Sequence, residues 1–318
     1  MRWASAFVLL FAAAAALAQS DYPSRPVRII VPSPPSGGTD IVARVLAAHF
    51  SSAFGQQFFV ENKPGAGNMI GIEAAARAAP DGYTLLVSAS TIALNSVLYK
   101  KVPYDPVRDF APITLAATAP NILVVNPKLP IKSVADLIAA AKARPGALSY
   151  GTPGIGTSPH LCMELFKSMA GIDLQHVPYK GTAAAVMDVI GGQIQVAFAT
   201  ALTAKPLIDA GRLRALAVSG PRRVAALPDV PPVAEAGVPG YEAMQWYGLL
   251  APAGTPAAII ERVHGEAVVA LRSPEMKARL ATDGAEPLST TPAEFGAHIK
   301  RELEKWSRVR DTAHIERQ

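Results

Sequence analysis

The stretch Leu148–Phe166 constrains the fold most, because it combines a short strand, a glycine-rich turn and the start of a helix. The run Leu148–Tyr150 favours β structure. The apolar residues Leu161, Leu165 and Phe166 then recur at helical spacing. Between the two elements lie glycines that permit backbone angles forbidden to other side chains, namely Gly151, Gly154 and Gly156.

The start of this helix is a candidate anion site. We predict that it begins near Thr157 or Ser158, where either hydroxyl can cap it and Pro159 suits the first turn. The unpaired N–H groups of a helix start carry a partial positive charge that attracts a carboxylate or a phosphate. Gly156, Thr157 and Ser158 are therefore candidate ligand contacts. The alternative is an ordinary connection whose glycines only form the corner, and this stretch leaves both interpretations open.

The same device occurs near the beginning of the chain. A buried-strand pattern at Pro26–Val31 leads into Gly37, Gly38, Thr39 and Asp40, and Thr39 or Asp40 would cap the helix that carries Ile41 and Phe50. A second strand, Phe58–Val60, leads into another glycine turn. A third, Tyr83–Val87, delivers Ser88, Ser90 and Thr91 to its carboxyl end, where open α/β sheets bind ligands. A simple capped connection is again the alternative.

A further helix start follows the strand at His176–Pro178. Here Tyr179, Lys180, Gly181 and Thr182 are candidate contacts, since Thr182 could cap the helix Ala183–Ile190 and Lys180 could add a full positive charge. A solvated lysine at an ordinary helix start explains Lys180 equally well.

Several classes of function are disfavoured. No glycine turn has the dinucleotide-binding or phosphate-loop spacing, and no metal-ligand spacing occurs, so we expect no cofactor and no metal. The net charge of +5 is a modest excess, which argues against a nucleic-acid partner. Ser158 and His160 could suggest a hydrolase, but the nucleophile-elbow motif is missing and residues two apart on a helix do not face each other. We therefore expect no enzyme activity.

The N-terminus predicts export. Arg2, an apolar run from Ala4 to Leu17 and the ending Ala16-Leu17-Ala18 match the three parts of a secretory signal peptide, with an uncleaved anchor as the alternative. We expect residues 1–18 to be removed, the mature chain to begin at Gln19, and the protein to be periplasmic.

The C-terminal part reads as a strand, Gln245–Ala251, and three helices, roughly Ala257–Leu271, Pro274–Asp283 and Pro292–Arg310. If the strand returns to the first domain, these helices pack on that domain. The last is predicted to be an amphipathic surface helix, because apolar residues alternate with charges along it: Phe295, Ile299, Leu303 and Trp306.

The chain resembles the periplasmic substrate-binding proteins of tripartite tricarboxylate transporters, often called Bug receptors, along essentially its whole mature length. The resemblance rests on several separate motifs in order: Gly37–Asp40, Glu61–Gly67 (ENKPGAG), Ala79–Leu86 (APDGYTLL), Tyr104–Phe110 (YDPVRDF), His176–Gly181 (HVPYKG), Leu227–Pro231 (LPDVP) and Gly248–Pro256 (GLLAPAGTP). Two turns depart from the usual pattern, at Pro34-Pro35-Ser36 and at Asn68-Met69.

The resemblance implies an α/β fold of the periplasmic binding protein kind, type II-like, with a ligand cleft between two domains joined by two crossover strands. We expect domain 1 at 19–124 and 246–318, and domain 2 at 125–245, with crossovers near Ile122–Asn126 and Gln245–Ala251. It also implies a monomer that holds a small carboxylated ligand, a di- or tricarboxylate, an amino acid or an aromatic acid. Delivery to integral membrane transporter subunits would follow. A receptor that presents its ligand to a membrane sensor is the alternative.

Overall fold

A computed structural model of the chain describes residues 22–35, 37–281, 284–313 and 315–318. The expected signal peptide at 1–18, the expected start at Gln19, and Ser36 lie outside the described residues. Among the helices that are described, none combines the length and the apolar character that a membrane crossing requires.

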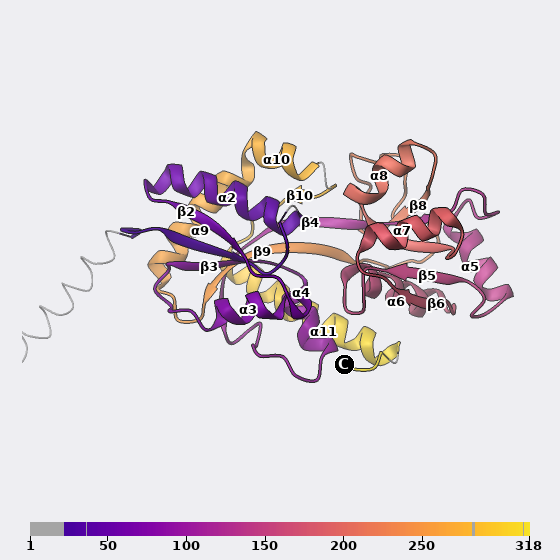
Figure 1. Cartoon of the computed structure of the whole chain (residues 1–318), viewed down its shortest axis with the longest axis horizontal. Helices are drawn as coiled ribbons and strands as arrows, with labels where there is room; N and C mark the ends of the chain where they lie inside the picture. Colours follow the sequence, from indigo (N-terminus) through magenta and orange to yellow (C-terminus); the bar gives the residue numbers. More distant parts are fainter. Residues whose placement is uncertain (1–21, 36, 282–283, 314) are drawn as a thin grey trace, which may run out of the picture.

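The molecule has two halves joined side by side (Figure 1). The first half is built on a sheet in the order β2-β1-β3-β9-β4, with β10 on the outer edge of β4. The first three strands run parallel, whereas β9 is antiparallel to both of its neighbours. These strands are β1 (Val27–Val31), β2 (Phe58–Asn62), β3 (Thr84–Ala89), β4 (Phe110–Val125), β9 (Met244–Pro252) and β10 (Glu286–Pro287).

Helices cover both faces of this sheet, because its strands are apolar on both sides. Ile29 and Leu85 pack into a cluster with α2 (Gly38–Phe54), α9 (Ala257–Arg272) and α10 (Pro274–Ala281). The next residues along the same strands, Ile30 and Leu86, pack into a cluster on the opposite face with helices α3 (Met69–Ala76), α4 (Thr91–Leu98) and α11 (Pro292–Thr312). A short 3₁₀ turn, η1 (Ala66–Asn68), precedes α3.

The second half is built on parallel strands β6, β5 and β7, and it continues into the end of β4. Its elements are α5 (Val134–Ala143), β5 (Ser149–Thr152), α6 (Ser158–Ala170), β6 (Gln175–Pro178), α7 (Thr182–Gly191), β7 (Val196–Thr200), α8 (Ala201–Asp209) and β8 (Arg214–Val218).

Strand β4 belongs to both halves. It pairs with β9 as far as Pro120, and from Asn121 onward it pairs with β7 and β8. The sequence predicts only its last part, Ile122–Val125, because the preceding residues contain Pro112 and Pro120 and show no clean alternation. The resulting α/β architecture agrees with the expected fold class.

Helix α11 corrects one expectation. It does not pack on the first half alone, since Phe295 and Ile299 belong to the core of the first half whereas Trp306 and Val309 belong to the core of the second. The indole N–H groups of Trp246 and Trp306 both donate to Oε2 of the buried Glu302, at 3.1 and 2.9 Å. In Figure 1, α11 accordingly lies beneath both halves. The chain is therefore linked by a helix as well as by strands.

Ser219 fastens the two crossing segments to each other. Its N–H donates to Asn121 O at 2.8 Å, and its hydroxyl oxygen accepts the Asn121 N–H at 2.8 Å. Its hydroxyl donates to Ala243 O at 2.5 Å, and its carbonyl accepts the Ala243 N–H at 2.9 Å. Ser219 is fully buried, so water cannot replace these bonds. The segments that enter and leave the second half are thus held in register at one residue.

We expect Ser219→Ala to lower the free energy of unfolding by about 3 kcal/mol, because it leaves a buried N–H and a buried carbonyl without partners. Urea denaturation measures the change. Ser168→Ala, on an exposed face of α6, is the matched control and should change stability by less than about 0.5 kcal/mol. Equal stability of the two variants would contradict the role assigned to Ser219.

Candidate functional site

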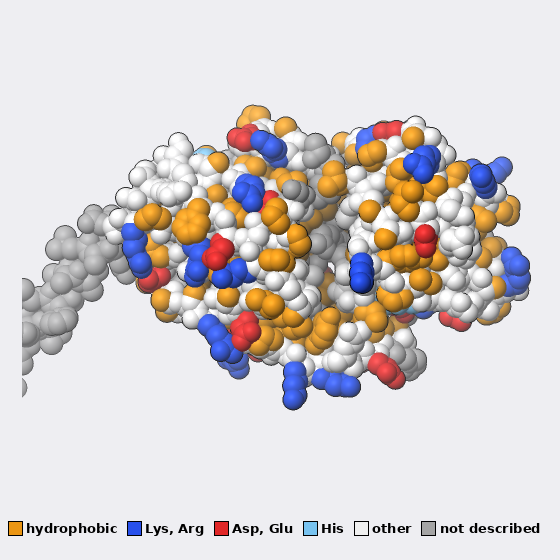
Figure 2. Space-filling view, in the orientation of Figure 1, with side chains coloured by type: hydrophobic (Ala, Val, Ile, Leu, Met, Phe, Trp, Pro, Cys, Tyr) orange, Lys and Arg blue, Asp and Glu red, His pale blue; other side chains and the backbone are white. Residues whose placement is uncertain are grey.

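A cavity of about 350 Å³ lies between the two halves, beside the crossing strand β9. This volume is within the range of roughly 300–1,000 Å³ that is usual for small-molecule sites. Figure 2 shows the furrow between the halves on the face of the molecule that it displays. The lining comes from both halves and from β9: Ser33, Pro34, Pro35, Gly37, Gly38, Thr39, Asn68, Ala89, Thr91, Thr200, Leu202, Gln245 and Tyr247.

Four helices begin at this cavity. The residues that precede their first turns are Gly37 for α2, Asn68 for α3, Ser90 for α4 and Thr200 for α8, and none of them caps its helix with a side-chain hydrogen bond. The first N–H groups of each helix have no partner within the helix, and the helix dipole makes that end partly positive. None of the described lining residues is charged. The cavity is therefore suited to an anion held by N–H groups and hydroxyls.

The caps differ from those predicted. Helix α2 begins at Gly38, so Thr39 and Asp40 lie inside its first turn. Thr157 does precede α6, but its hydroxyl donates to Gly154 O at 2.7 Å and does not cap the helix. Thr182 is the first residue of α7 and follows Gly181. Gly181, with φ of 114°, lies in the region that favours glycine, and a local turn bond engages Thr157, whereas Gly37 precedes α2 in an ordinary extended conformation with φ of −89°.

Several predicted residues of the first half lie at the cavity, while others support it from behind. Gly37, Gly38, Thr39 and Thr91 line it. The Asp40 carboxylate accepts hydrogen bonds from Arg44 Nε at 2.8 Å and Asn62 Nδ2 at 3.0 Å. Ser88 is fully buried and is not part of the lining. Ser90 donates to Gln245 Oε1 at 3.0 Å and thereby contacts a lining residue.

The predicted residues of the second half do not line the cavity. The Ser158 hydroxyl oxygen accepts from Asn121 Nδ2 at 2.9 Å, and Asn121 pairs in register with the lining residue Thr200. Tyr179 donates to Asp188 Oδ2 at 2.7 Å, and burial together with this bond raises its pKa to about 12. Lys180 is exposed, and Gly181 and Thr182 begin α7. The structure thus does not bring Gly156, Thr157, Ser158 or the Tyr179–Thr182 segment to the lining.

Sequence reasoning missed the lining residues Ser33, Asn68, Thr200, Leu202, Gln245 and Tyr247. Helix α8, which brings Thr200 and Leu202 there, was not predicted, because Pro206 interrupts its helical pattern. Gln245 and Tyr247 lie in a predicted strand, and their alternation with Trp246 was the available signal. Gln245 and Tyr247 flank the buried Trp246 on the strand, so their side chains face the opposite side from it.

Two histidines, the buried His160 and the partly buried His176, support the glycine turn that follows β5. His160 Nδ1 accepts the Gly156 N–H at 3.3 Å, and His176 Nε2 lies 2.7 Å from the Thr152 hydroxyl, which accepts the Gly154 N–H at 3.2 Å. The two imidazole rings are 4.6 Å apart. Burial, and for His160 also the proximity of His176, lowers the pKa of both imidazoles, that of His160 to about 4. An acceptor nitrogen must be unprotonated, so the hydrogen bond and the low pKa of His160 agree.

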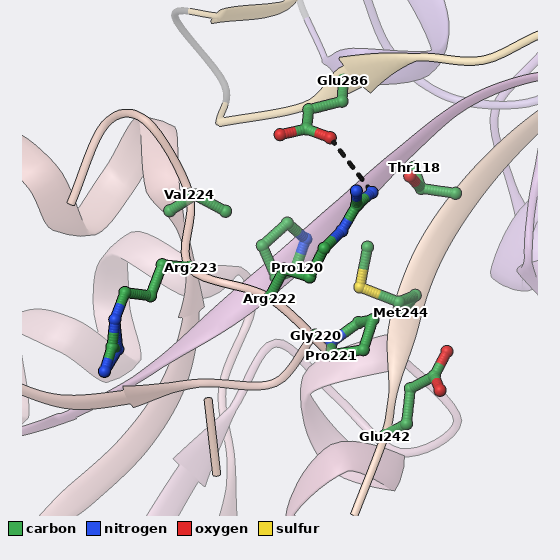
Figure 3. Close-up of a pocket in the computed structure, with 10 residues that line it drawn as sticks. All are labelled: Thr118, Pro120, Gly220, Pro221, Arg222, Arg223, Val224, Glu242, Met244 and Glu286. Atoms are coloured by element: carbon green, nitrogen blue, oxygen red, sulfur yellow. Dashed lines mark ion pairs between the residues drawn. The ribbon is translucent and has the colours of Figure 1, made fainter. Parts of the chain in front are cut away.

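A smaller cavity of about 150 Å³ lies on the other face of the crossing strands (Figure 3). It is lined by Met244, whose neighbour Gln245 faces the larger cavity, because successive side chains of a strand point to opposite faces. Its arginines have acidic partners: Arg222 reaches Glu286 at 3.8 Å, and Arg223 reaches Glu235 at 3.1 Å. A larger groove of about 650 Å³ near Ala225 and Ala285 is mainly apolar.

The candidate hydrolase pair does not form in the structure. The Ser158 hydroxyl contacts Asn121 and Cys162, while His160 Nδ1 is occupied by a backbone N–H. Nucleophilic catalysis requires the base to contact the hydroxyl. No group of three or more acidic, histidine or cysteine side chains capable of holding a metal occurs in the part of the chain that the structure describes.

Comparison with known proteins identifies relatives over almost the whole chain. Residues 42–314 match the family described as the tripartite tricarboxylate transporter family receptor. Protein BugT of Bordetella pertussis is 37% identical over 305 residues, which cover 95% of this chain and 94% of BugT.

Solved structures of similar proteins also match almost the whole chain. Rpa4515 of R. palustris, solved with adipate, is 38% identical, has a TM-score of 0.82, and is matched over 93% of this chain and 99% of its own. MatC from Rhodopseudomonas palustris, solved with bound malate, is 29% identical, has a TM-score of 0.77, and is matched over 91% and 99% of the two chains.

The two low histidine pKa values predict a loss of stability in acid. Both imidazoles are neutral in the folded protein, whereas in the unfolded chain they take up protons near pH 6.5. Their contribution is thus complete above pH 6.5 and is lost as the pH falls toward 4, by about 3 kcal/mol for His160.

Urea denaturation at pH 7 and pH 4 of the natural protein and of His160→Asn measures this effect. Asn keeps an acceptor for the Gly156 N–H but does not titrate, so the variant should lose less stability between the two pH values. Carboxylates that titrate in the same range change the free energy of unfolding of both proteins equally, so their effect cancels in the comparison. The same loss in both proteins would contradict the assignment.

Proposed function

Because this chain belongs to the tripartite tricarboxylate transporter receptor family, whose members are periplasmic solute-binding receptors and not enzymes, we propose that it captures a small carboxylate between its two halves. It then delivers this ligand to the membrane subunits of a tripartite tricarboxylate transporter. Export through the segment 1–18 would place it in the periplasm.

The observation that carries the proposal is the meeting of four helix starts at one uncharged cavity. Their N–H groups supply partial positive charge without a lysine or arginine, and Thr91 and Gln245 add side-chain donors. A neutral sugar carries no negative charge for this partial positive charge to stabilise. The ligands named for two solved relatives, adipate for Rpa4515 and malate for MatC, are carboxylates of suitable size and support the same class.

Capture requires the halves to approach each other. We propose that they act as two domains, residues 19–124 with 246–318 and residues 125–245, which close about the crossing strands. Closure would bring the Gly156–Ser158 and Tyr179–Thr182 segments toward a ligand already held by Gly38, Thr39 and Thr91. Bending at a few crossing residues is enough for such a motion. Ser219 fixes the two crossing segments to each other, so they would bend together.

Small carboxylates should raise the melting temperature of the protein, and at equal concentration the tighter ligand should raise it more, because a ligand that binds only the folded state stabilises it. We expect a concentration-dependent rise with adipate or malate in differential scanning fluorimetry and none with glucose. Thr91→Val should weaken binding by about tenfold or more, the value of a hydrogen bond to a charged group.

Thr312→Val, at an exposed position of α11, makes the same chemical change far from the cavity and should leave the affinity unaltered. Stabilisation by glucose alone, or equal affinity of the Thr91 and Thr312 variants, would contradict the proposed site.

A further inference from the structure

We propose that this cavity selects carboxylates that carry no ammonium group, and that Asn68, Ser90 and Asn121 are the positioning residues that set this preference. The inference rests on the proposed function and narrows it, since amino acids are carboxylates too. It depends on which hydrogen-bonding groups are already occupied by protein partners and which remain for a ligand.

On the first half, Asn68 acts on Thr91. The Asn68 side-chain amide donates from Nδ2 to the Thr91 hydroxyl oxygen at 3.1 Å. A hydroxyl has a single hydrogen, and here the oxygen is serving as acceptor. The Thr91 hydrogen is therefore left to donate, and both residues line the cavity. A ligand oxygen is the partner that this arrangement requires.

On the crossing strand, Ser90 acts on Gln245. The Ser90 hydroxyl is buried and donates to Gln245 Oε1 at 3.0 Å. This bond engages one lone pair of the amide oxygen and fixes the amide so that the two Nε2 hydrogens of Gln245 point away from Ser90. Because Gln245 lines the cavity between the two halves, it presents donors to a ligand at that point.

On the second half, Asn121 acts on Ser158 in the same way. Asn121 is buried, and its Nδ2 donates to the Ser158 hydroxyl oxygen at 2.9 Å. The Ser158 hydroxyl, whose other contact is Cys162 Sγ at 3.9 Å, lies at the start of α6 outside the cavity lining, and the proposed closure of the two halves would bring its hydrogen to the ligand. Three polar pairs, one on each half and one on the crossing strand, thus each present a hydrogen-bond donor.

An ammonium group would need the opposite arrangement. It carries three donors and is bound best by a carboxylate, yet no acidic side chain is among the described lining residues. The nearest carboxylate along the α2 start, Asp40, has its oxygens engaged by Arg44 and Asn62. Four helix starts would in addition repel a cation. The lining hydroxyls can accept hydrogen bonds but carry no negative charge, and enclosing an ammonium group without a carboxylate to pair it costs far more than enclosing a hydroxyl.

Malate and aspartate test the inference, because they are dicarboxylates that differ only in a hydroxyl or an ammonium group on the same carbon. By isothermal titration calorimetry at pH 7 we expect malate, or succinate, to bind at least about tenfold more tightly than aspartate. Aspartate binding as tightly as malate would overturn the selectivity while leaving the proposed carboxylate receptor intact. Absence of heat and of thermal stabilisation with malate, succinate, adipate and aspartate alike would instead refute the proposed function, and the inference with it.

Two variants test the positioning residues. Gln245→Glu has the same shape but replaces the donors with an acceptor. It should weaken the binding of malate by about a hundredfold, so that aspartate binds as tightly as malate or more tightly. Ser90→Ala frees the Gln245 amide to rotate, so it should narrow the ratio of the two dissociation constants by several-fold. A merely structural role for Ser90 would weaken both ligands equally and leave that ratio unchanged.

Gln175→Glu adds the same charge on β6, at an exposed position remote from the cavity, and serves as the control for net charge. It should leave both dissociation constants unaltered. An unchanged malate-to-aspartate ratio in both Gln245→Glu and Ser90→Ala, with folding verified by circular dichroism, would overturn the assignment.

Discussion

The meeting of helix starts at one point is the interaction on which the rest of the structure depends. Parallel strands of an α/β sheet end at one edge, and each following helix begins there with unpaired N–H groups. In this protein α2, α3 and α4 supply such starts from one half and α8 supplies one from the other. Because the lining between them holds no charged side chain among the described residues, the backbone itself provides the positive field. An anion in this space can accept hydrogen bonds from the helix starts of both halves at once.

The two halves are joined in a way that keeps both of them in contact with this cavity. Strand β4 passes from one sheet to the other between Pro120 and Asn121, and Ser219 ties it to the segment that returns through Ala243. Beneath the strands, α11 buries Ile299 in one core and Trp306 in the other, and Glu302 receives the indoles of both Trp246 and Trp306. These links limit how far the halves can move apart. The closure proposed above would therefore take place on the cavity side of the crossing strands.

Much of this could be predicted from the sequence, and the exceptions have physical causes. Local patterns predicted the bounds of α9 to within one residue, because apolar spacing is a local property. The glycine turn before α2 was predicted to be a site element, and Gly37, Gly38 and Thr39 line the candidate cavity. The partnership of Ser90 with Gln245 joins residues 155 positions apart, and no local pattern encodes it. The burial of Trp306 between two cores likewise depends on how the halves are arranged.

The most direct test of the account is the ionisation state of the bound ligand. Succinate labelled with ¹³C at its carboxyl groups, bound to the protein and followed by NMR from pH 7 to pH 3, reports that state through the carboxyl chemical shift. If helix starts and oriented donors hold the ligand, its carboxylates stay ionised in the complex to a lower pH than in free succinate, because hydrogen bonds to the charged form lower a pKa. A bound carboxyl group that takes up its proton at a higher pH than the free acid would contradict the account.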